Sequence, residues 1–145
     1  MIPKIIHFFH HNKNFLHTCS NMVRRCYHSW KYHLPNYELR LWHPEMPEFK
    51  QMLKRSTFLN DVYEKKIWAV VADYVRTWAV FHHGGIYLDT DIYLFQNLDH
   101  LLHNQFFSFG ISTGAVNNKM TWHAEPAFFG ARRGGGCHDR DVKNL

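Results

Sequence analysis

Two aspartates in the second half of the chain, Asp89 and Asp91, have the spacing of a pair that shares a cation. Successive side chains of an extended segment point to opposite faces, so both carboxylates would lie on one side, together with Tyr87 and Tyr93. Two carboxylates this close repel each other unless a cation or a proton lies between them, and Mg²⁺ and Mn²⁺ prefer oxygen ligands. An octahedral ion with only two protein ligands keeps positions open for phosphate oxygens, which suits a diphosphate.

An Asp-x-Asp pattern also has a plain explanation, because short acidic patterns often mark a turn or a solvated strand edge. Here apolar residues flank the acids on both sides, and Gly84 and Gly85 precede them, which places the acids at the end of a buried strand. Ligands of open α/β sheets bind beyond the carboxyl ends of the strands. The context therefore favours a ligand site over a solvated turn.

A second candidate pair, Asp73 and Arg76, lies upstream in a segment with helical periodicity. Residues three apart share one face of a helix. One interpretation is a surface ion pair, which stabilises a helix by roughly 0.3–0.5 kcal/mol. The other is functional: the carboxylate accepts hydrogen bonds from sugar hydroxyls, while the guanidinium holds a phosphate or orients the acid.

The elements that must position these residues alternate between strands and helices. Apolar runs predict strands, and apolar residues at steps of three and four predict helices. The predicted strands cover residues 2–9, 37–42, 86–95, 106–111 and 126–131, and a turn follows over residues 132–136. The predicted helices cover residues 18–33, 48–55 and 62–83. This order indicates an α/β fold whose first strand belongs to a parallel sheet.

The composition limits the classes of protein that fit. A chain of 145 residues suits one domain, 1–145, and 46% hydrophobic residues argue against disorder. The formal charge of +5 favours anionic partners, but the basic residues are scattered, so nucleic-acid binding ranks last among the alternatives. The cysteines, Cys19, Cys26 and Cys137, form no Cys-x-x-Cys pair and fit a reducing compartment. The N-terminus resembles neither a signal peptide nor a membrane span, so we expect a cytoplasmic protein.

The histidines offer a rival metal site, since the chain has 13 of them. Zn²⁺ or Ni²⁺ could bind the group at residues 7, 10 and 11, or the pair His82 and His83. The spacing matches no closed site. His7 lies in an apolar strand, where a hydrogen-bonded core histidine is the simpler expectation, and His82 and His83 end a helix, where positive charge is favoured.

Four blocks of sequence carry a resemblance to a known family. They are IPKIIH at 2–7, SWKYHLPNYELRLW at 29–42, ADYVR at 72–76 and GGIYLDTD at 84–91. Together they resemble the DXD-containing glycosyltransferases, and most closely glycosyltransferase family 32, which includes initiating α-1,6-mannosyltransferases and capsular-polysaccharide enzymes. The resemblance implies a GT-A fold, which is a Rossmann-like mixed sheet flanked by helices. It also implies Mn²⁺ or Mg²⁺, a UDP- or GDP-sugar donor, and transfer with retention of configuration.

The resemblance further implies a role for each acidic residue. Asp91 would ligate the metal, and Asp89 would contact the metal or the donor. Asp73 and Arg76 would hold the transferred sugar and its phosphate. These four residues are therefore the expected catalytic set.

The same resemblance adds Gly85, Tyr87 and His10 to the donor-binding residues. His10, followed by His11, stands where the family often has an aromatic residue that stacks on the base. Family catalytic domains continue well beyond residue 131, so the fold is expected to be incomplete at its C-terminus. The alternative function is a truncated, non-catalytic module that binds a nucleotide sugar or a protein. Implied partners are the donor and a saccharide or glycolipid acceptor, in surface polysaccharide synthesis at the inner face of the membrane.

Overall fold

The computed structural model describes residues 1–116 and 119–134, so Cys137 and the end of the predicted turn at 132–136 lie outside the described residues. The elements in chain order are β1 (Ile5–Phe9), α1 (Phe15–Thr18), α2 (Asn21–His33), β2 (Glu38–Trp42), α3 (Pro47–Arg55), α4 (Thr57–Glu64), α5 (Trp68–His83), β3 (Gly85–Leu88), the 3₁₀ turn η1 (Asp99–Leu101), β4 (Phe106–Val116) and β5 (Lys119–Ala131). In the part of the chain that the structure describes, no helix has the length and apolar character needed to cross a bilayer.

The strands form one mixed sheet in the order β2-β1-β3-β5-β4. β1 pairs in parallel with both β2 and β3, and His7 lies opposite Arg40 on one side and Tyr87 on the other. β5 pairs antiparallel with β3 and with β4. The expected α/β fold with a mixed sheet and flanking helices is therefore confirmed, and its parallel part is the β2-β1-β3 half.

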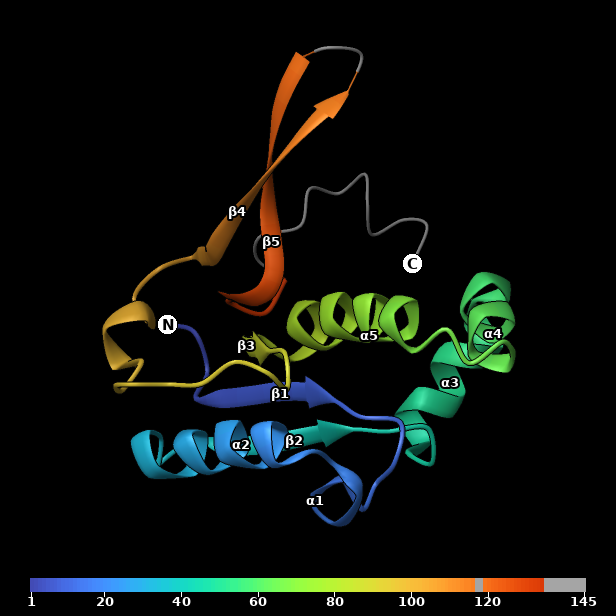
Figure 1. Cartoon of the computed structure of the whole chain (residues 1–145), viewed down its shortest axis with the longest axis horizontal. Helices are drawn as coiled ribbons and strands as arrows, with labels where there is room; N and C mark the ends of the chain where they lie inside the picture. The colour runs from blue at the N-terminus through green and yellow to red at the C-terminus, as the bar shows by residue number, and fades with distance from the viewer. Residues whose placement is uncertain (117–118, 135–145) are drawn as a thin grey trace.

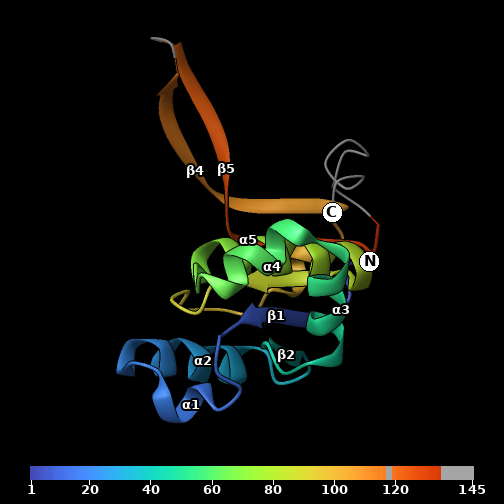
Figure 2. The same cartoon turned by 90° about the vertical axis from the view of Figure 1, so that its right-hand side faces the viewer.

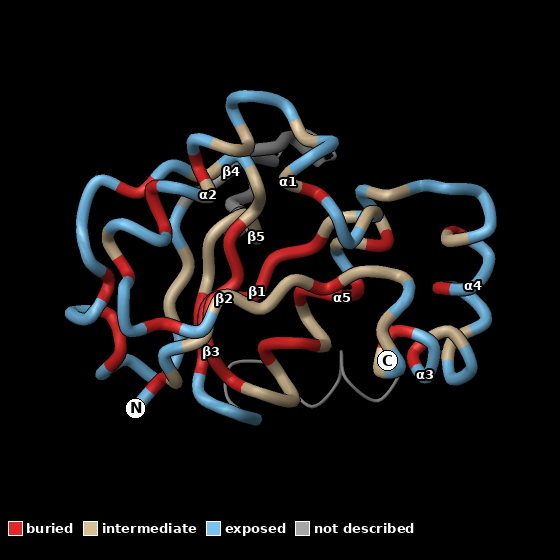
Figure 3. The backbone as a smooth tube through the Cα atoms, turned by 90° about the horizontal axis from the view of Figure 1, so that it is seen from below, coloured by how far each residue is buried: buried red, intermediate tan, exposed pale blue. Residues whose placement is uncertain are grey.

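The central strands separate two layers of helices. α1 and α2 cover one face of the sheet, while α5 covers the other, with α3 and α4 packed beside it (Figures 1 and 2). Side chains alternate along β1, so Phe8 joins the cluster on the α2 side and Phe9 joins the cluster on the α5 side. Figure 3 shows that burial is concentrated along the central strands. The same alternation in β3 directs Leu88 towards α2 and Tyr87 towards α5.

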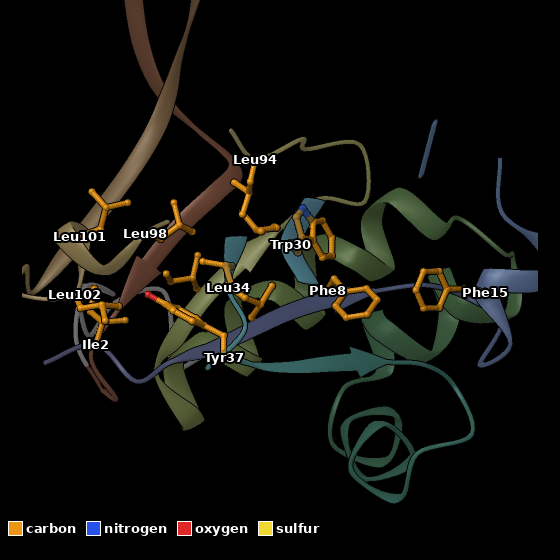
Figure 4. Close-up of a cluster of buried hydrophobic side chains, with 13 residues drawn as sticks. Ile2, Phe8, Phe15, Trp30, Leu34, Tyr37, Leu94, Leu98, Leu101 and Leu102 are labelled. Atoms are coloured by element: carbon orange, nitrogen blue, oxygen red, sulfur yellow. The ribbon is translucent and has the colours of Figure 1, made fainter. Parts of the chain in front are cut away.

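The core on the α2 side includes chain that has no regular secondary structure. Trp30 of α2 is fully buried against Phe8, with ring centroids 5.3 Å apart in an edge-to-face arrangement. Leu94, Leu98 and other residues that follow β3 join this cluster (Figure 4). Burying one large apolar side chain contributes roughly 1.5–3 kcal/mol. The segment after β3 is thus held on α2 by packing.

The helix predicted over residues 62–83 is wrong as a single helix. α4 ends at Glu64 and α5 begins at Trp68. Between them Lys66 adopts a φ of 56°, in the left-handed region, and its amide donates to the Tyr63 carbonyl. Apolar residues recur at helical spacing in both helices, so the sequence pattern gives no sign of the break between them.

Several other boundaries differ from the prediction, including the start of α4 at Thr57 rather than at residue 62. The helix expected from residue 18 begins at Asn21, because the Ser20 hydroxyl caps it by accepting from the Val23 amide at 3.3 Å. A separate short helix, α1, precedes it and was not predicted. β4 and β5 are longer than the predicted strands, and their outer halves pair only with each other in the described residues.

Candidate functional site

The acidic motif lies in a turn at the carboxyl end of β3. The Asp89 amide still donates to the Ala127 carbonyl of β5 at 2.8 Å, and the Ile92 amide then donates to the Asp89 carbonyl at 3.0 Å, closing a turn. The motif therefore lies at the end of a buried strand, as predicted. The predicted continuation of the strand to residue 95 is wrong, so strand alternation does not place Asp91 and Tyr93 on the Tyr87 side.

Arg76 connects the predicted helix pair to this turn. Its side chain is 9% exposed, and its Nη2 lies 3.0 Å from Asp73 Oδ1 and 3.3 Å from Asp89 Oδ1. Its guanidinium also lies over the Tyr87 ring, 4.8 Å from the centroid. Asp73 and Arg76 do form an ion pair, but the arginine is buried rather than on the surface. Both acids contact the same nitrogen, Nη2, so Arg76 lies between the two carboxylates and can hold them in a fixed orientation.

Tyr87 lies beneath Arg76 and is 2% exposed. Its hydroxyl donates to the Asp89 carboxylate, and burial raises the pKa of Tyr87. Burial also raises the pKa of Asp89, while the Arg76 charge and the Tyr87 hydrogen bond act in the opposite direction. The structure thus brings four predicted residues together: Tyr87, Asp89, Asp73 and Arg76.

Asp91, the second acid of the motif, lies in the turn just beyond this group. It is exposed, and among the described residues it forms no ion pair. Asp91 interacts electrostatically with Cys26 on α2: burial, and to a smaller extent the Asp91 carboxylate, raise the pKa of the Cys26 thiol. Asp91 also raises the pKa of Asp89, so the two acids interact electrostatically.

The chain after Asp91 is fixed to α2 by two hydrogen bonds that the sequence did not reveal. The Trp30 indole donates to the Ile92 carbonyl at 2.7 Å, and the Leu94 amide donates to the Ser29 hydroxyl at 3.0 Å. Ser29 and Trp30 open the block at 29–42 that carried the family resemblance. The resemblance therefore indicated the segment, while its contact with the acidic turn required the structure.

Gly85 and His10 lie away from the four-residue group. Gly85 begins β3, at the end opposite Asp89, with a φ of 106°, and a Cβ there would lie 2.8 Å from the Ile5 carbonyl oxygen. The structure accounts for this glycine by backbone packing. His10 follows β1 at the same sheet edge as the acids, and its ring stacks on His11 with centroids 4.4 Å apart. His11 in turn stacks on Trp68 at the start of α5, 5.2 Å away, a contact that the sequence analysis missed.

The histidines do not form a metal centre in the described residues. No group of three or more histidine, cysteine, aspartate or glutamate side chains there could hold a metal ion. His7 is a core residue, as expected: its Nε2 bonds the Gly84 carbonyl at 2.8 Å, and its Nδ1 accepts from the Trp42 indole at 3.0 Å. His83 lies at the end of α5, and its Nε2 is 3.2 Å from Glu48 Oε2.

Removing the charge of Arg76 tests whether it supports the acids. Arg76→Met keeps an unbranched apolar stem, removes the charged guanidinium, and is expected to lower the free energy of unfolding at pH 7 by about 2 kcal/mol. Losing one partner of a fully buried ion pair costs about 3–5 kcal/mol, and solvent screens these acids, because Asp73 is 60% exposed and Asp89 31%. Without Arg76 the pKa of Asp89 rises further. Since protonation relieves the unpaired charge, the loss should shrink as the pH falls.

Chemical denaturation at pH 7 and pH 5 measures this change. Adding Asp89→Asn to the Arg76→Met variant removes the unpaired carboxylate and is expected to restore part of the stability. Equal losses at both pH values, with no recovery in the double variant, would contradict the ion-pair explanation.

The comparison with protein families decides the classification. The family described as "Glycosyltransferase sugar-binding region containing DXD motif" matches residues 20–107. The chain belongs to this family. The match includes α2, α5 and the acidic turn. Asp89-Thr90-Asp91 is the only Asp-x-Asp sequence within the matched residues, so it is the motif that the family description names. A search of curated proteins found no match.

The fold of this DXD family member is also similar to a solved structure. The structure named PaToxG Glycosyltransferase matches with a TM-score of 0.63 and 16% sequence identity. The similarity covers 92% of this chain and 55% of that chain, so this chain spans about half the length of the PaToxG structure. At this level of identity the likeness shows a shared fold.

Proposed function

We propose that the chain is the donor-binding part of a glycosyltransferase that moves a hexose from a UDP- or GDP-linked sugar to a hydroxyl of a saccharide or glycolipid. The observation that carries this proposal is the placement of the family's acidic motif. Asp89 and Asp91 lie in a turn at the carboxyl end of β3, and the buried Arg76 joins Asp89 to Asp73. Ligands of open α/β sheets bind at such an end.

The residues at this turn suit a hard divalent cation, Mn²⁺ or Mg²⁺. Asp91 offers an exposed carboxylate with no ion pair in the described part of the chain, and Asp89 is partly accessible. Such cations prefer oxygen ligands and usually keep several positions for water and substrate phosphates. A cation bound there would neutralise the charge that develops on the departing nucleotide diphosphate.

The residues of the chain itself orient the donor. In this proposal Asp73, which is largely exposed, accepts hydrogen bonds from the hydroxyls of the transferred sugar. Arg76 and the Tyr87 hydroxyl hold the Asp89 carboxylate in place from below. The rings of His10, His11 and Trp68 form a stack at the same sheet edge, which supports a place for the base beside them.

Further details of the proposal come from the family-32 resemblance. They are transfer with retention of configuration and a role in surface or capsular polysaccharide synthesis at the inner face of the membrane. The cytoplasmic location that we also propose rests instead on the cysteine pattern, which fits a reducing compartment. Each is separable from donor binding, so the central test addresses the donor site.

The central test is a calorimetric titration of the purified chain with UDP and with GDP, with and without Mn²⁺. We expect one of the two nucleotides to bind in a metal-dependent manner and the other to bind more weakly. Slow, metal-dependent hydrolysis of the corresponding nucleotide sugar would establish an enzyme. Binding without hydrolysis would instead favour the alternative, a non-catalytic nucleotide-sugar module, and a folded chain that binds neither nucleotide would contradict the proposal.

A further inference from the structure

A pocket of about 640 Å³ lies beside the acidic turn, between α2 and the chain that follows Asp91. Its lining is basic, aromatic and hydroxylic: Arg25, His28, Ser29, Tyr32, His33 and Tyr93. The volume lies within the range of small-molecule sites, roughly 300–1,000 Å³. No role in donor binding assigned above uses the side chain of any of these residues.

The pocket has a fixed position relative to the acidic motif. Tyr93, on one wall, is two residues beyond Asp91, and Ser29, on the other, binds the Leu94 amide. Trp30, next to Ser29, binds the Ile92 carbonyl and packs in the same cluster as Leu94 (Figure 4). These contacts hold the pocket next to the turn that carries Asp91. A molecule bound there would lie close to the reacting end of the donor.

The charge on α2 indicates what kind of molecule fits. The helix sequence NMVRRCYHSWKYH contains no acidic residue. Arg24 is occupied, since its guanidinium donates to the Leu16 carbonyl at 2.9 Å, whereas Arg25 forms no ion pair with any described residue. An arginine with unused donors favours a carboxylate or phosphate as its ligand.

The aromatic residues of the pocket favour a saccharide. Tyr32 is 81% exposed and Tyr93 49% exposed, although tyrosine rings usually bury much of their surface. Phe95, just beyond, is 85% exposed. The negative face of an aromatic ring attracts polarised C–H groups, which line one face of a pyranose. Because the lining is concave and polar, the pocket fits a sugar ring better than it fits a lipid surface.

We propose that this pocket is the acceptor subsite and that it takes a saccharide with an acidic group. Arg25 binds the carboxylate or phosphate of the acceptor, and the rings of Tyr32 and Tyr93 contact its sugar faces. This inference rests on the proposed function, because it names the acceptor class for the same reaction centre. It places donor and acceptor on opposite sides of the acidic turn. The donor lies on the side of Asp73, a residue of α5, and the acceptor lies in the pocket against α2.

The test uses two tetrasaccharides of equal length as probes, one containing glucuronate residues and one neutral. Calorimetry with the full chain, Mn²⁺ and the preferred nucleotide should detect the acidic probe, and the neutral probe should bind at least about 10-fold more weakly. Arg25→Gln should weaken binding of the acidic probe about 10-fold, which is the effect of one charge-assisted hydrogen bond. The matched control is Arg55→Gln, an exposed arginine on α3, and it should bind like the unsubstituted chain.

The outcomes separate this inference from the proposed function. If the chain binds nucleotide but the acidic probe fails to bind, or if Arg25→Gln binds it normally, the acceptor subsite is wrong while the donor site stands. If the unsubstituted chain binds no nucleotide, the donor site itself fails, and the acceptor role fails with it. Arg25-dependent binding to phosphatidylserine vesicles, without binding of the tetrasaccharide, would assign the pocket to a lipid surface and overturn the proposal.

Discussion

Replacing Asp91 with asparagine is expected to weaken metal-dependent nucleotide binding by about 100-fold or more, without changing the unfolding temperature. Loss of a residue that only supports a metal ligand costs about 10–100-fold in affinity, so loss of a direct ligand should reach at least the upper end. Folding should be unaffected, because Asp91 is exposed and forms no ion pair with a described residue. Calorimetric titration and a thermal melt of the same sample measure both effects.

The matched control for this experiment is Asp61→Asn on α4. Asp61 is also exposed, and its only ion pair in the described residues is with Lys65, one helical turn away. Nucleotide binding by this variant should equal that of the unsubstituted chain. If Asp91→Asn binds nucleotide and metal with unchanged affinity, Asp91 is not a metal ligand and the proposed donor site is incorrect.

Acidification from pH 7 to pH 4 is expected to reduce the free energy of unfolding by about 3 kcal/mol through His7 alone. Burial lowers the pKa of His7 from 6.5 to about 4. In the unfolded chain His7 therefore becomes protonated below pH 6.5, whereas in the folded chain it becomes protonated only near pH 4. Stability is fully present above the unfolded pKa and falls across this window as the pH decreases.

The hydrogen bonds of His7 give this effect a structural cause. The Gly84 carbonyl can only accept and the Trp42 indole can only donate, so His7 must carry its proton on Nε2 and accept at Nδ1. A proton added at Nδ1 would face the indole N–H and break that contact. The folded state therefore requires a neutral imidazole.

Urea denaturation of the unsubstituted chain and of His7→Gln between pH 4 and pH 7 tests this prediction. The variant should be less stable at pH 7 and should lose less stability on acidification than the unsubstituted chain. His17→Gln, at an exposed position on α1, is the matched control and should keep the original pH dependence. Parallel pH profiles for His7→Gln and the unsubstituted chain would contradict the assignment to His7.

The sequence was sufficient for the order and type of most elements. Apolar residues that recur at steps of three and four identified α2 and α5, and a continuous apolar run identified β1. Each of these elements buries a regular set of positions. The break at Lys66 and the end of β3 at Leu88 depend on backbone conformation and on pairing with β5, which leave no periodic trace. The length of β4 and β5 was missed for the same reason.

The composition of the candidate site was predicted better than its geometry. Asp73, Arg76 and Asp89 were chosen from spacing and resemblance, and the structure brings them together. Helical spacing could not reveal that Arg76 is buried, because the Tyr87 ring that covers it comes from another element. The end of the strand before Asp91 also escaped prediction, since it follows from a turn closed by the Ile92 amide.

The position of β1 between β2 and β3 has a consequence for the order in which the molecule assembles. His7 pairs with Arg40 on one side and with Tyr87 on the other, so the second contact closes a much longer loop than the first. Loop-closure entropy makes that contact the costlier one by about 0.8 kcal/mol. During synthesis from the N-terminus, the partner on β2 also leaves the ribosome long before the partner on β3. We therefore expect the turn that carries Asp89 and Asp91 to form late in folding, after the nascent chain has joined β1 to β2.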